Sequence, residues 1–486
     1  MTRGAITTKA AASACAAAVV VVLLALTVIV PGLNPAGPVT VVMAGSALAA
    51  LALLVPAIRA AREADDLDAS TGLTLAVGWL ISLPIVIAVF AGSVDRRLDP
   101  SRDLVPVLPG WYETASHVAQ GLLIALAAAL LVRRLISGTR RVTLHTAGLL
   151  AIVLWALAWL ASGLEGGPLL NLPGATLLAC LLAATVLPRG RGAAVGAGLF
   201  GVTLAIASGL LAAFQFDLAS VPCRDYCVLG SALTGAVPNE NLLGTALLVA
   251  LPFAYLGFRG RPRTWLVAYL AFMAFATGSR GAMLGVVIVI GALLVVRPRL
   301  DADRRTPVRA AAAGLLLTAV LLPSAYVVAH DWTSSTSSLD DRPSLWRVAS
   351  EYTEDAPVFG YGPDRWGSLY LQTGEIPLAA QHSTHNQFVD VLFNAGWVGV
   401  ALLAAIVVAM LWSAGYARPA VLVVLATVFF IGIAERAWQI GAADFASFSL
   451  IALILLGPTR VAAREAPAAE QPARARPRPA VAVPSG

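Results

Sequence analysis

Long apolar runs separated by short polar connections make up most of the chain. They begin near residues 12, 38, 71, 116, 143, 169, 193, 241, 264, 281, 309, 395, 418 and 440. A helix needs about 20 apolar residues to cross the hydrocarbon core of a bilayer. Such continuous runs satisfy their backbone hydrogen bonds as helices, whereas a barrel needs short alternating strands. The pattern predicts an all-α integral membrane protein, a polytopic bundle of about 12–14 transmembrane helices.

The composition agrees with residence in a lipid bilayer. Of the 486 residues, 58% are hydrophobic and 12% are charged, and that charged share is about half of the usual one in soluble proteins. The first run, residues 12–30, follows Arg3 and Lys9 as a signal peptide would, but it is longer than the usual apolar region of one, and further runs follow. We therefore expect a retained helix.

Arginines mark alternate connections between the runs. Because arginines near the ends of transmembrane helices are held on the cytoplasmic side, the alternation predicts that both termini are cytoplasmic. It also places a turn at residues 277–282 and one large loop at residues 330–384 on the outer side. The arginines in the predicted cytoplasmic connections are Arg59, Arg62, Arg133, Arg134, Arg140, Arg141, Arg189, Arg191, Arg259, Arg261, Arg263, Arg297, Arg299, Arg304, Arg305 and Arg309.

The same alternation divides the chain into successive parts. Residues 1–234 are N-terminal transmembrane helices, and residues 235–329 are further helices around the outer turn. Residues 330–384 are the extracytoplasmic loop, long enough to be partly helical, and residues 385–459 are the C-terminal transmembrane helices. Residues 460–486, rich in Pro, Ala and Arg, are expected to be a disordered cytoplasmic tail.

The four cysteines fit no metal-binding spacing. Cys15 and Cys180 lie inside apolar runs, where they act as small packing residues. Cys223 and Cys227 lie in a polar connection on the predicted outer side, where an oxidised pair and two free thiols are both open.

Arg280 stands between two apolar runs on the predicted outer side. An arginine near the membrane core costs about 2.5–3.5 kcal/mol on insertion scales. Its guanidinium group therefore either extends to lipid headgroups or meets an anionic ligand such as a diphosphate, whose oxygens it matches.

Arg342 lies in the predicted outer loop, directly before Pro343, a residue that suits the first turn of a helix. The spacing of the apolar residues that follow, Leu345, Val348, Ala349 and Tyr352, predicts an amphipathic helix. Arg342 would add its charge to a helix N-terminus, which already favours an anion. The simpler alternative is that Arg342 pairs with Asp340 or Asp341 in a solvated turn.

His382 and His385 lie just before another helical pattern. Two histidines at this spacing, without a nearby third ligand, give little support for zinc, so no metal is expected. At the head of a helix the macrodipole disfavours the cationic form, which leaves a neutral imidazole able to accept a proton. A general base and a histidine that only caps the helix both fit the pattern.

Other polar features carry less information. Asn241 lies in a polar cap at the start of an apolar run, and Glu435 is expected to pair with Arg436 at an outer helix end. Residues 360–363 indicate a turn rather than a phosphate-binding loop. No nucleotide fingerprint and no nucleic-acid-binding module is visible, so we expect neither a cofactor nor a nucleic-acid partner.

Several of these segments together resemble the O-antigen ligase and polymerase family. They are residues 238–244, residues 277–282, Arg342 with Trp346, residues 356–362, and His385–Asn386 leading to Gly396 and Gly399. Their order and spacing carry the resemblance over roughly residues 235–400, whereas the N-terminal half is similar only in being a run of helices.

The resemblance implies a metal-independent glycosyltransferase at the outer face of the bacterial cytoplasmic membrane, in cell-surface polysaccharide biosynthesis. Its donor would be a glycan on undecaprenyl diphosphate, and its acceptor a glycan, a lipid or a protein. Arg280 and Arg342 would bind the diphosphate, and His385 would activate the acceptor hydroxyl. Asn386, Trp346, His382 and Asn241 are further candidates for substrate binding. Ligase and polymerase are both open, because they share these residues and differ in acceptor.

The main rival is a transporter or flippase of polyprenyl-linked sugars. Transporters commonly have ionisable residues in the middle of spans and repeated halves with broken helices. Here the candidate residues lie in outer connections of the C-terminal half, and no repeat is visible. A non-catalytic scaffold would give these residues no evident purpose.

Overall fold

The computed structural model describes residues 36–98, 104–137, 143–223, 227–300, 342–373, 383–414, 418–433 and 435–457. Within these ranges the chain is mainly helical, and the predicted all-α membrane fold is confirmed. Seven of the described helices are long and apolar enough to cross a membrane, and shorter apolar helices accompany them. The predicted helices near residues 12 and 309 and the tail from residue 460 lie outside the described residues.

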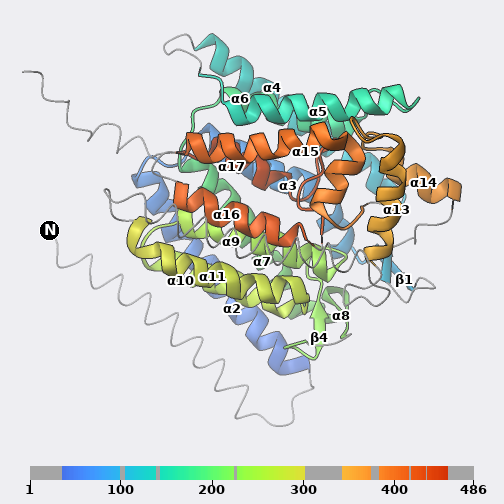
Figure 1. The fold of residues 1–486 in the computed structure, drawn as a ribbon. Coiled ribbons are helices and arrows are strands. Elements are labelled where there is room, and N and C mark those ends of the chain that lie inside the picture. Colours follow the sequence, from blue (N-terminus) through green and yellow to red (C-terminus); the bar gives the residue numbers. More distant parts are fainter. Residues whose placement is uncertain are drawn as a thin grey trace, which may run out of the picture.

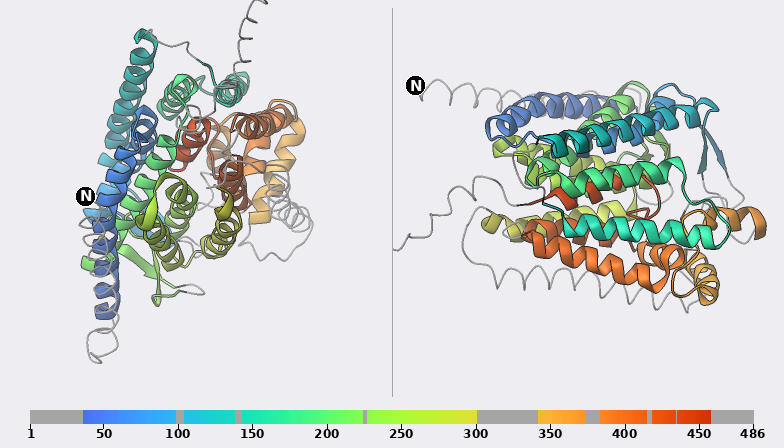
Figure 2. Two further views of the ribbon diagram at one scale, coloured as in Figure 1. Left: turned by 90° about the vertical axis from the view of Figure 1, so that its left-hand side faces the viewer. Right: turned by 90° about the horizontal axis from the view of Figure 1, so that it is seen from above.

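The helices of the bundle run side by side (Figure 1 and Figure 2). They are α2 (Ala36–Glu63), α3 (Ala69–Phe90), α4 (Trp111–Ile136), α5 (Thr146–Leu164), α6 (Leu172–Val186), α7 (Gly192–Phe214), α9 (Glu240–Gly257), α10 (Gly260–Ala276), α11 (Arg280–Leu300), α15 (Gln387–Ser413), α16 (Arg418–Ile431) and α17 (Ser447–Leu455). The connections add the short helices α8 (Phe216–Ala219), α13 (Arg342–Asp355) and α14 (Arg365–Thr373), and the antiparallel hairpins β1–β2 (Asp95–Leu98 with Leu104–Val107) and β3–β4 (Ser220–Pro222 with Ser231–Leu233).

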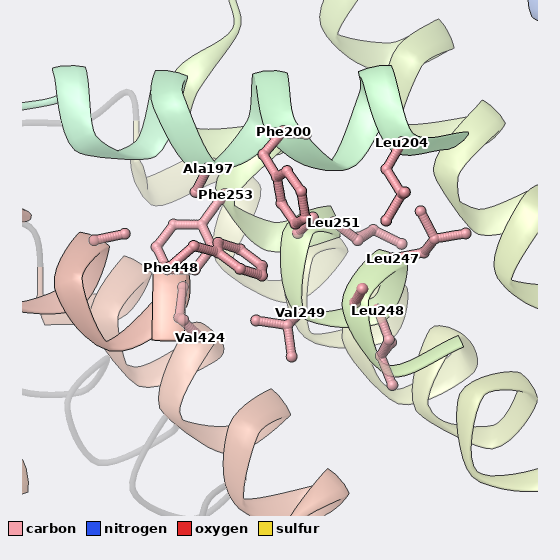
Figure 3. Packing of buried hydrophobic residues seen from close by; sticks show 14 of the residues in the cluster. Ala197, Phe200, Leu204, Leu247, Leu248, Val249, Leu251, Phe253, Val424 and Phe448 are labelled. Carbon is pink, nitrogen blue, oxygen red and sulfur yellow. The ribbon is translucent and has the colours of Figure 1, made fainter. Parts of the chain in front are cut away.

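Helix α7 is the centre of the bundle. Its apolar stretch is 78% buried, more than that of any other described long span. Phe200 of α7 packs against Phe448 of α17, and Phe253 of α9 adjoins the same ring (Figure 3). A side chain at Gly198 would come within 2.8 Å of the Ala254 backbone, so this small residue lets α7 and α9 approach closely, as is common between helices in lipid.

Arginines gather at one end of the bundle and cap helices there. The Nε atom of Arg189 donates to the carbonyl of Ile454, 3.0 Å away, at the end of α17. Arg259, which precedes α10, pairs with the buried carboxylate of Asp66, which precedes α3, at 2.7 Å. The Arg189 contact satisfies a carbonyl that has no partner within its own helix, and the Arg259 ion pair joins the segments that precede α3 and α10.

The opposite end carries the two hairpins, α13 and α14 (Figure 1). Cys223 and Cys227 form a disulfide there, between β3 and β4. The β1–β2 hairpin occupies the connection after α3, which the sequence pattern shows only as a mixture of charges. Helix α17 begins at Ser447, several residues later than the apolar run that predicts it, because residues 432–446 form an irregular connection. We refer to residues 432–446 as the 432–446 segment; residue 434 is not among the described residues.

Candidate active site

Several helix ends meet at the end of the bundle opposite the arginines. The backbone N–H of Gln387, the first residue of α15, donates to the carbonyl of Gly432 just after α16, at 2.7 Å. Gly285 of α11 packs against Phe430 in the last turn of α16. In turn, Gly244 of α9 packs against the turn that precedes α11. The starts of α9, α11 and α15 and the end of α16 therefore lie together.

Helix α13 brings Arg342 to this end. The predicted amphipathic helix is present, with Arg342 as its first residue, and its apolar face buries Leu345 and Trp346. The Trp346 indole N–H donates to the carbonyl of Thr384 at 3.0 Å, and the side chain is 0% exposed. With no exposed surface to offer a ligand, Trp346 acts by holding α13 against the residue that precedes His385.

His385 is held in an unusual backbone conformation directly before α15. Its φ angle is +53°, in the left-handed region that few residues other than glycine adopt. The side-chain oxygen of Asn386 caps α15 by accepting from the N–H groups of Phe388 and Val389, and its amide donates to the carbonyl of Ile433 at 3.0 Å. Residues whose strained backbone is held in place by surrounding contacts are common at functional sites. This conformation therefore favours His385 as a functional residue.

A carboxylate from the 432–446 segment joins His385 to Arg342. The Nδ1 atom of His385 lies 2.9 Å from one oxygen of Glu435, and Nη2 of Arg342 lies 2.8 Å from the other. Glu435 thus pairs with His385 and Arg342 rather than with Arg436 as expected. Asp340 and Asp341, the alternative partners of Arg342, lie outside the described residues. Arg436 instead lies 3.6 Å from the buried carboxylate of Asp390 in the first turn of α15.

The charges around Glu435 keep it ionised. Burial alone would raise its pKa, but the hydrogen bond with His385, the charge of that ring when it is protonated and the charge of Arg342 more than offset that, so the pKa lies below its ordinary value of 4.5. A carboxylate can only accept hydrogen bonds, so Nδ1 of His385 carries the proton that faces Glu435. In a neutral imidazole, Nε2 then keeps its lone pair.

The connection between α13 and α14 is fastened to α15 where that helix breaks. Gly396 has a φ angle of +62° and interrupts the helical backbone. The backbone N–H of Tyr361 donates to the carbonyl of Phe393, and that of Trp397 donates to the carbonyl of Pro357, each at 2.9 Å. Residues 357–362 thus satisfy backbone groups that the break in α15 exposes.

The remaining candidates are placed as follows. Arg280 is exposed and is the first residue of α11, so a turn is present between α10 and α11 as predicted, while its side of the membrane stays a prediction. Asn241 is half-buried in the first turn of α9, and the cap itself is made by the side-chain oxygen of Asn239. His382 lies outside the described residues. Among the described residues, no group of three or more His, Cys, Asp or Glu side chains is arranged to hold a metal ion.

Glu435 is the site residue that sequence reasoning missed. It lies 50 residues after His385 and 93 after Arg342, and no periodicity connects positions so far apart. The available signal was a charged pair inside an otherwise apolar C-terminal region, which indicates function when it lies within a membrane bundle. Its partners could be assigned only from the folded chain.

Residues 265–404 match the family model described as O-antigen ligase. No curated protein and no solved structure matches the chain. The matched region contains Arg280, Arg342, Trp346, His385 and Asn386, whereas Asn241 and Glu435 lie outside it. Together with its apolar helices, this domain identifies a multi-pass bacterial membrane protein of glycan biosynthesis. Over residues 265–404, the chain is thus similar to the O-antigen ligase and polymerase family.

Proposed function

We propose that this protein transfers or polymerises a glycan from an undecaprenyl-diphosphate-linked donor onto an acceptor hydroxyl, at the outer face of the cytoplasmic membrane. The observation that carries the proposal is the Glu435 carboxylate, which joins His385 and Arg342 at 2.9 and 2.8 Å. A base, the group that orients it and an anion ligand thus converge at one end of the bundle, as acyl- and group-transfer sites require.

In the proposed reaction, Nε2 of His385 takes the proton of the acceptor hydroxyl as its oxygen bonds to the anomeric carbon. The bond from that carbon to the diphosphate oxygen breaks, the electron pair leaves with the diphosphate, and the configuration at carbon inverts. Glu435 stabilises the imidazolium that forms, as the carboxylate of a hydrolase triad does. No metal enters these steps.

Arg342 and Arg280 would stabilise the leaving diphosphate. A guanidinium group has five N–H donors, so the contact of Arg342 with Glu435 leaves others for phosphate oxygens. The starts of α9, α11, α13 and α15 add the positive ends of their dipoles to the same region. Asn386 and Trp346 would support the site by fixing α15 and α13, while Asn241 and His382 remain candidates for contacts with the substrate.

Two observations favour an extracytoplasmic site. Arginines gather at the opposite end of the bundle, as expected for the cytoplasmic side. The Cys223–Cys227 disulfide lies at the same end as the site, and disulfides persist in oxidising compartments. The transporter alternative has less support, because the described buried ion pairs of Asp66 and of Glu435 lie near the two ends of the bundle rather than midway along it.

The test is transfer in vitro by the purified full-length protein in nanodiscs. Undecaprenyl-diphosphate-linked glycan is supplied with candidate acceptors, in the presence of EDTA. Product that still forms in EDTA supports a metal-independent transferase, and product length separates single-step ligation from polymerisation. If no acceptor is modified and the lipid-linked glycan instead crosses the bilayer of proteoliposomes, the transferase proposal is wrong.

A further inference from the structure

Gln387 makes a two-bond contact with the backbone of the segment that carries Glu435. Its Nε2 donates to the carbonyl of Trp438 at 3.0 Å, and its Oε1 accepts from the Trp438 N–H at 2.6 Å. Both residues are buried, Gln387 at 2% and Trp438 at 3% exposure. One side chain thus satisfies both backbone groups of a residue that lies in irregular structure and has no helix or strand to pair with.

Among the described residues, the surroundings of these hydrogen bonds are mostly apolar, with Gln439 as the polar exception. Gln387 and Trp438 border a cavity whose other lining is mostly apolar, from Leu154, Leu403 and Ile406 among others. A water molecule needs several polar partners to be stable in such a place. Loss of the Gln387 amide would therefore leave the Trp438 N–H and carbonyl unpaired, and a buried unpaired group is costly.

Hydrogen bonds hold the chain on both sides of Glu435. On the N-terminal side of Glu435, the Gln387 N–H donates to the carbonyl of Gly432 at 2.7 Å, and the Asn386 amide donates to the carbonyl of Ile433 at 3.0 Å. After it, the Gln387 side chain holds Trp438. Residues 385–387 and 432–438 are thereby joined from both sides of Glu435, so that the carboxylate cannot shift without breaking a buried hydrogen bond.

We infer that Gln387 is a positioning residue of the proposed transferase, holding the 432–438 region so that Glu435 stays between His385 and Arg342. This inference rests on the proposed function for its effect on transfer, but its structural part stands on the contacts alone. The contact with Trp438 requires a donor and an acceptor at a fixed spacing on the side chain at position 387. Gln387→Glu keeps the shape and loses the donor, whereas Gln387→Met keeps the approximate volume and loses both.

The first experiment is hydrogen–deuterium exchange on the full-length protein in nanodiscs, comparing wild type with Gln387→Met and Gln387→Glu. We expect the amide of Trp438 to exchange roughly tenfold faster or more in Gln387→Met, because its acceptor is lost. Gln215→Met is the matched control, since Gln215 is exposed at the end of α7. Unchanged exchange at residues 432–438 in both Gln387 variants would overturn the inference, whether or not the protein transfers glycan.

The second experiment measures coupling through Glu435. A displacement of about 1 Å in a catalytic site lowers the rate by about 10²-fold. Gln387→Met should therefore lower the transfer rate by that order, and Gln387→Glu should lower it too. If Gln387 acts through Glu435, adding Gln387→Met to Glu435→Gln should lower the transfer rate by no more than about twofold further. Independent, multiplicative losses would refute the positioning role. A wild type that transfers nothing would refute the proposed function alone, because the exchange result does not depend on activity.

Discussion

The Nδ1 atom of His385 lies 2.9 Å from Oε2 of Glu435, and this contact determines which nitrogen of the imidazole is available for chemistry. With the proton of Nδ1 directed at the carboxylate, Nε2 is the acceptor in the neutral ring. The same carboxylate holds Arg342 through its other oxygen. The proposed base and one proposed diphosphate ligand therefore have a common support, and the expected effects of substitutions follow from it.

Glu435→Gln should reduce the rate of transfer by about 10²-fold or more, since the amide keeps the size but cannot stabilise an imidazolium ion or pair with Arg342 by charge. Transfer in nanodiscs, at saturating donor, measures the loss. Glu351→Gln, on the exposed side of α13, should leave the rate unchanged. If Glu435→Gln is as fast as wild type, the carboxylate has no part in the chemistry.

His385→Ala should abolish transfer and leave donor binding nearly intact, because the imidazole is proposed to accept a proton and not to bind phosphate. Donor affinity measured by calorimetry, beside the transfer rate, separates the two. His117→Ala, at an exposed position of α4, is the matched control. A parallel collapse of donor affinity would instead make His385 a binding or structural residue.

Arg342→Lys should lose much of the activity although it keeps the positive charge. A point charge on a flexible stem cannot contact Glu435 and a diphosphate with the planar fork of a guanidinium. The loss should appear both in donor affinity and in transfer rate. Arg347→Lys, exposed on the same helix, should retain wild-type values, and full activity of Arg342→Lys would exclude Arg342 from the site.

The lowered pKa of Glu435 predicts how its contribution to stability varies with pH. Because the folded-state pKa lies below the ordinary value of 4.5, the ionised carboxylate stabilises the folded state at higher pH. That stabilisation is lost as the pH falls from about 4.5 through the folded-state pKa. The difference in unfolding temperature between wild type and Glu435→Gln should thus not shrink between pH 8 and about 5, and should decline below that. A decline already near neutral pH would contradict the assignment.

Gly396→Ala should destabilise the attachment of residues 357–362 to α15. Gly396 has a φ angle of +62°, and an added methyl group would meet the backbone of Val358. Strain of this kind costs about 1–3 kcal/mol, so the unfolding temperature of the protein in detergent should fall. Gly291→Ala is the control, because that position of α11 has no atom within 4 Å of an added Cβ. An unchanged unfolding temperature would show that the break in α15 is not needed.

The sequence was sufficient for features that depend on local order along the chain. Apolar runs of sufficient length must become helices in lipid, and the spacing of apolar residues after Arg342 correctly predicted α13. The asymmetry of arginines indicated which helix ends lie together, and the arginines do gather at one end. The boundaries of α17 and the β1–β2 hairpin were less accessible, because a short apolar run and a mixture of charges each fit more than one local structure.

Only the tertiary structure decided which charged groups share a site. Glu435 and Arg436 are neighbours in the chain, and that proximity suggested an ion pair, yet the irregular backbone turns them to different partners, His385 with Arg342 on one side and Asp390 on the other. Residue type and spacing specify a helix because its contacts are local. The pairing of residues 50 or more positions apart depends on how those helices pack, and the chain sequence does not display that packing.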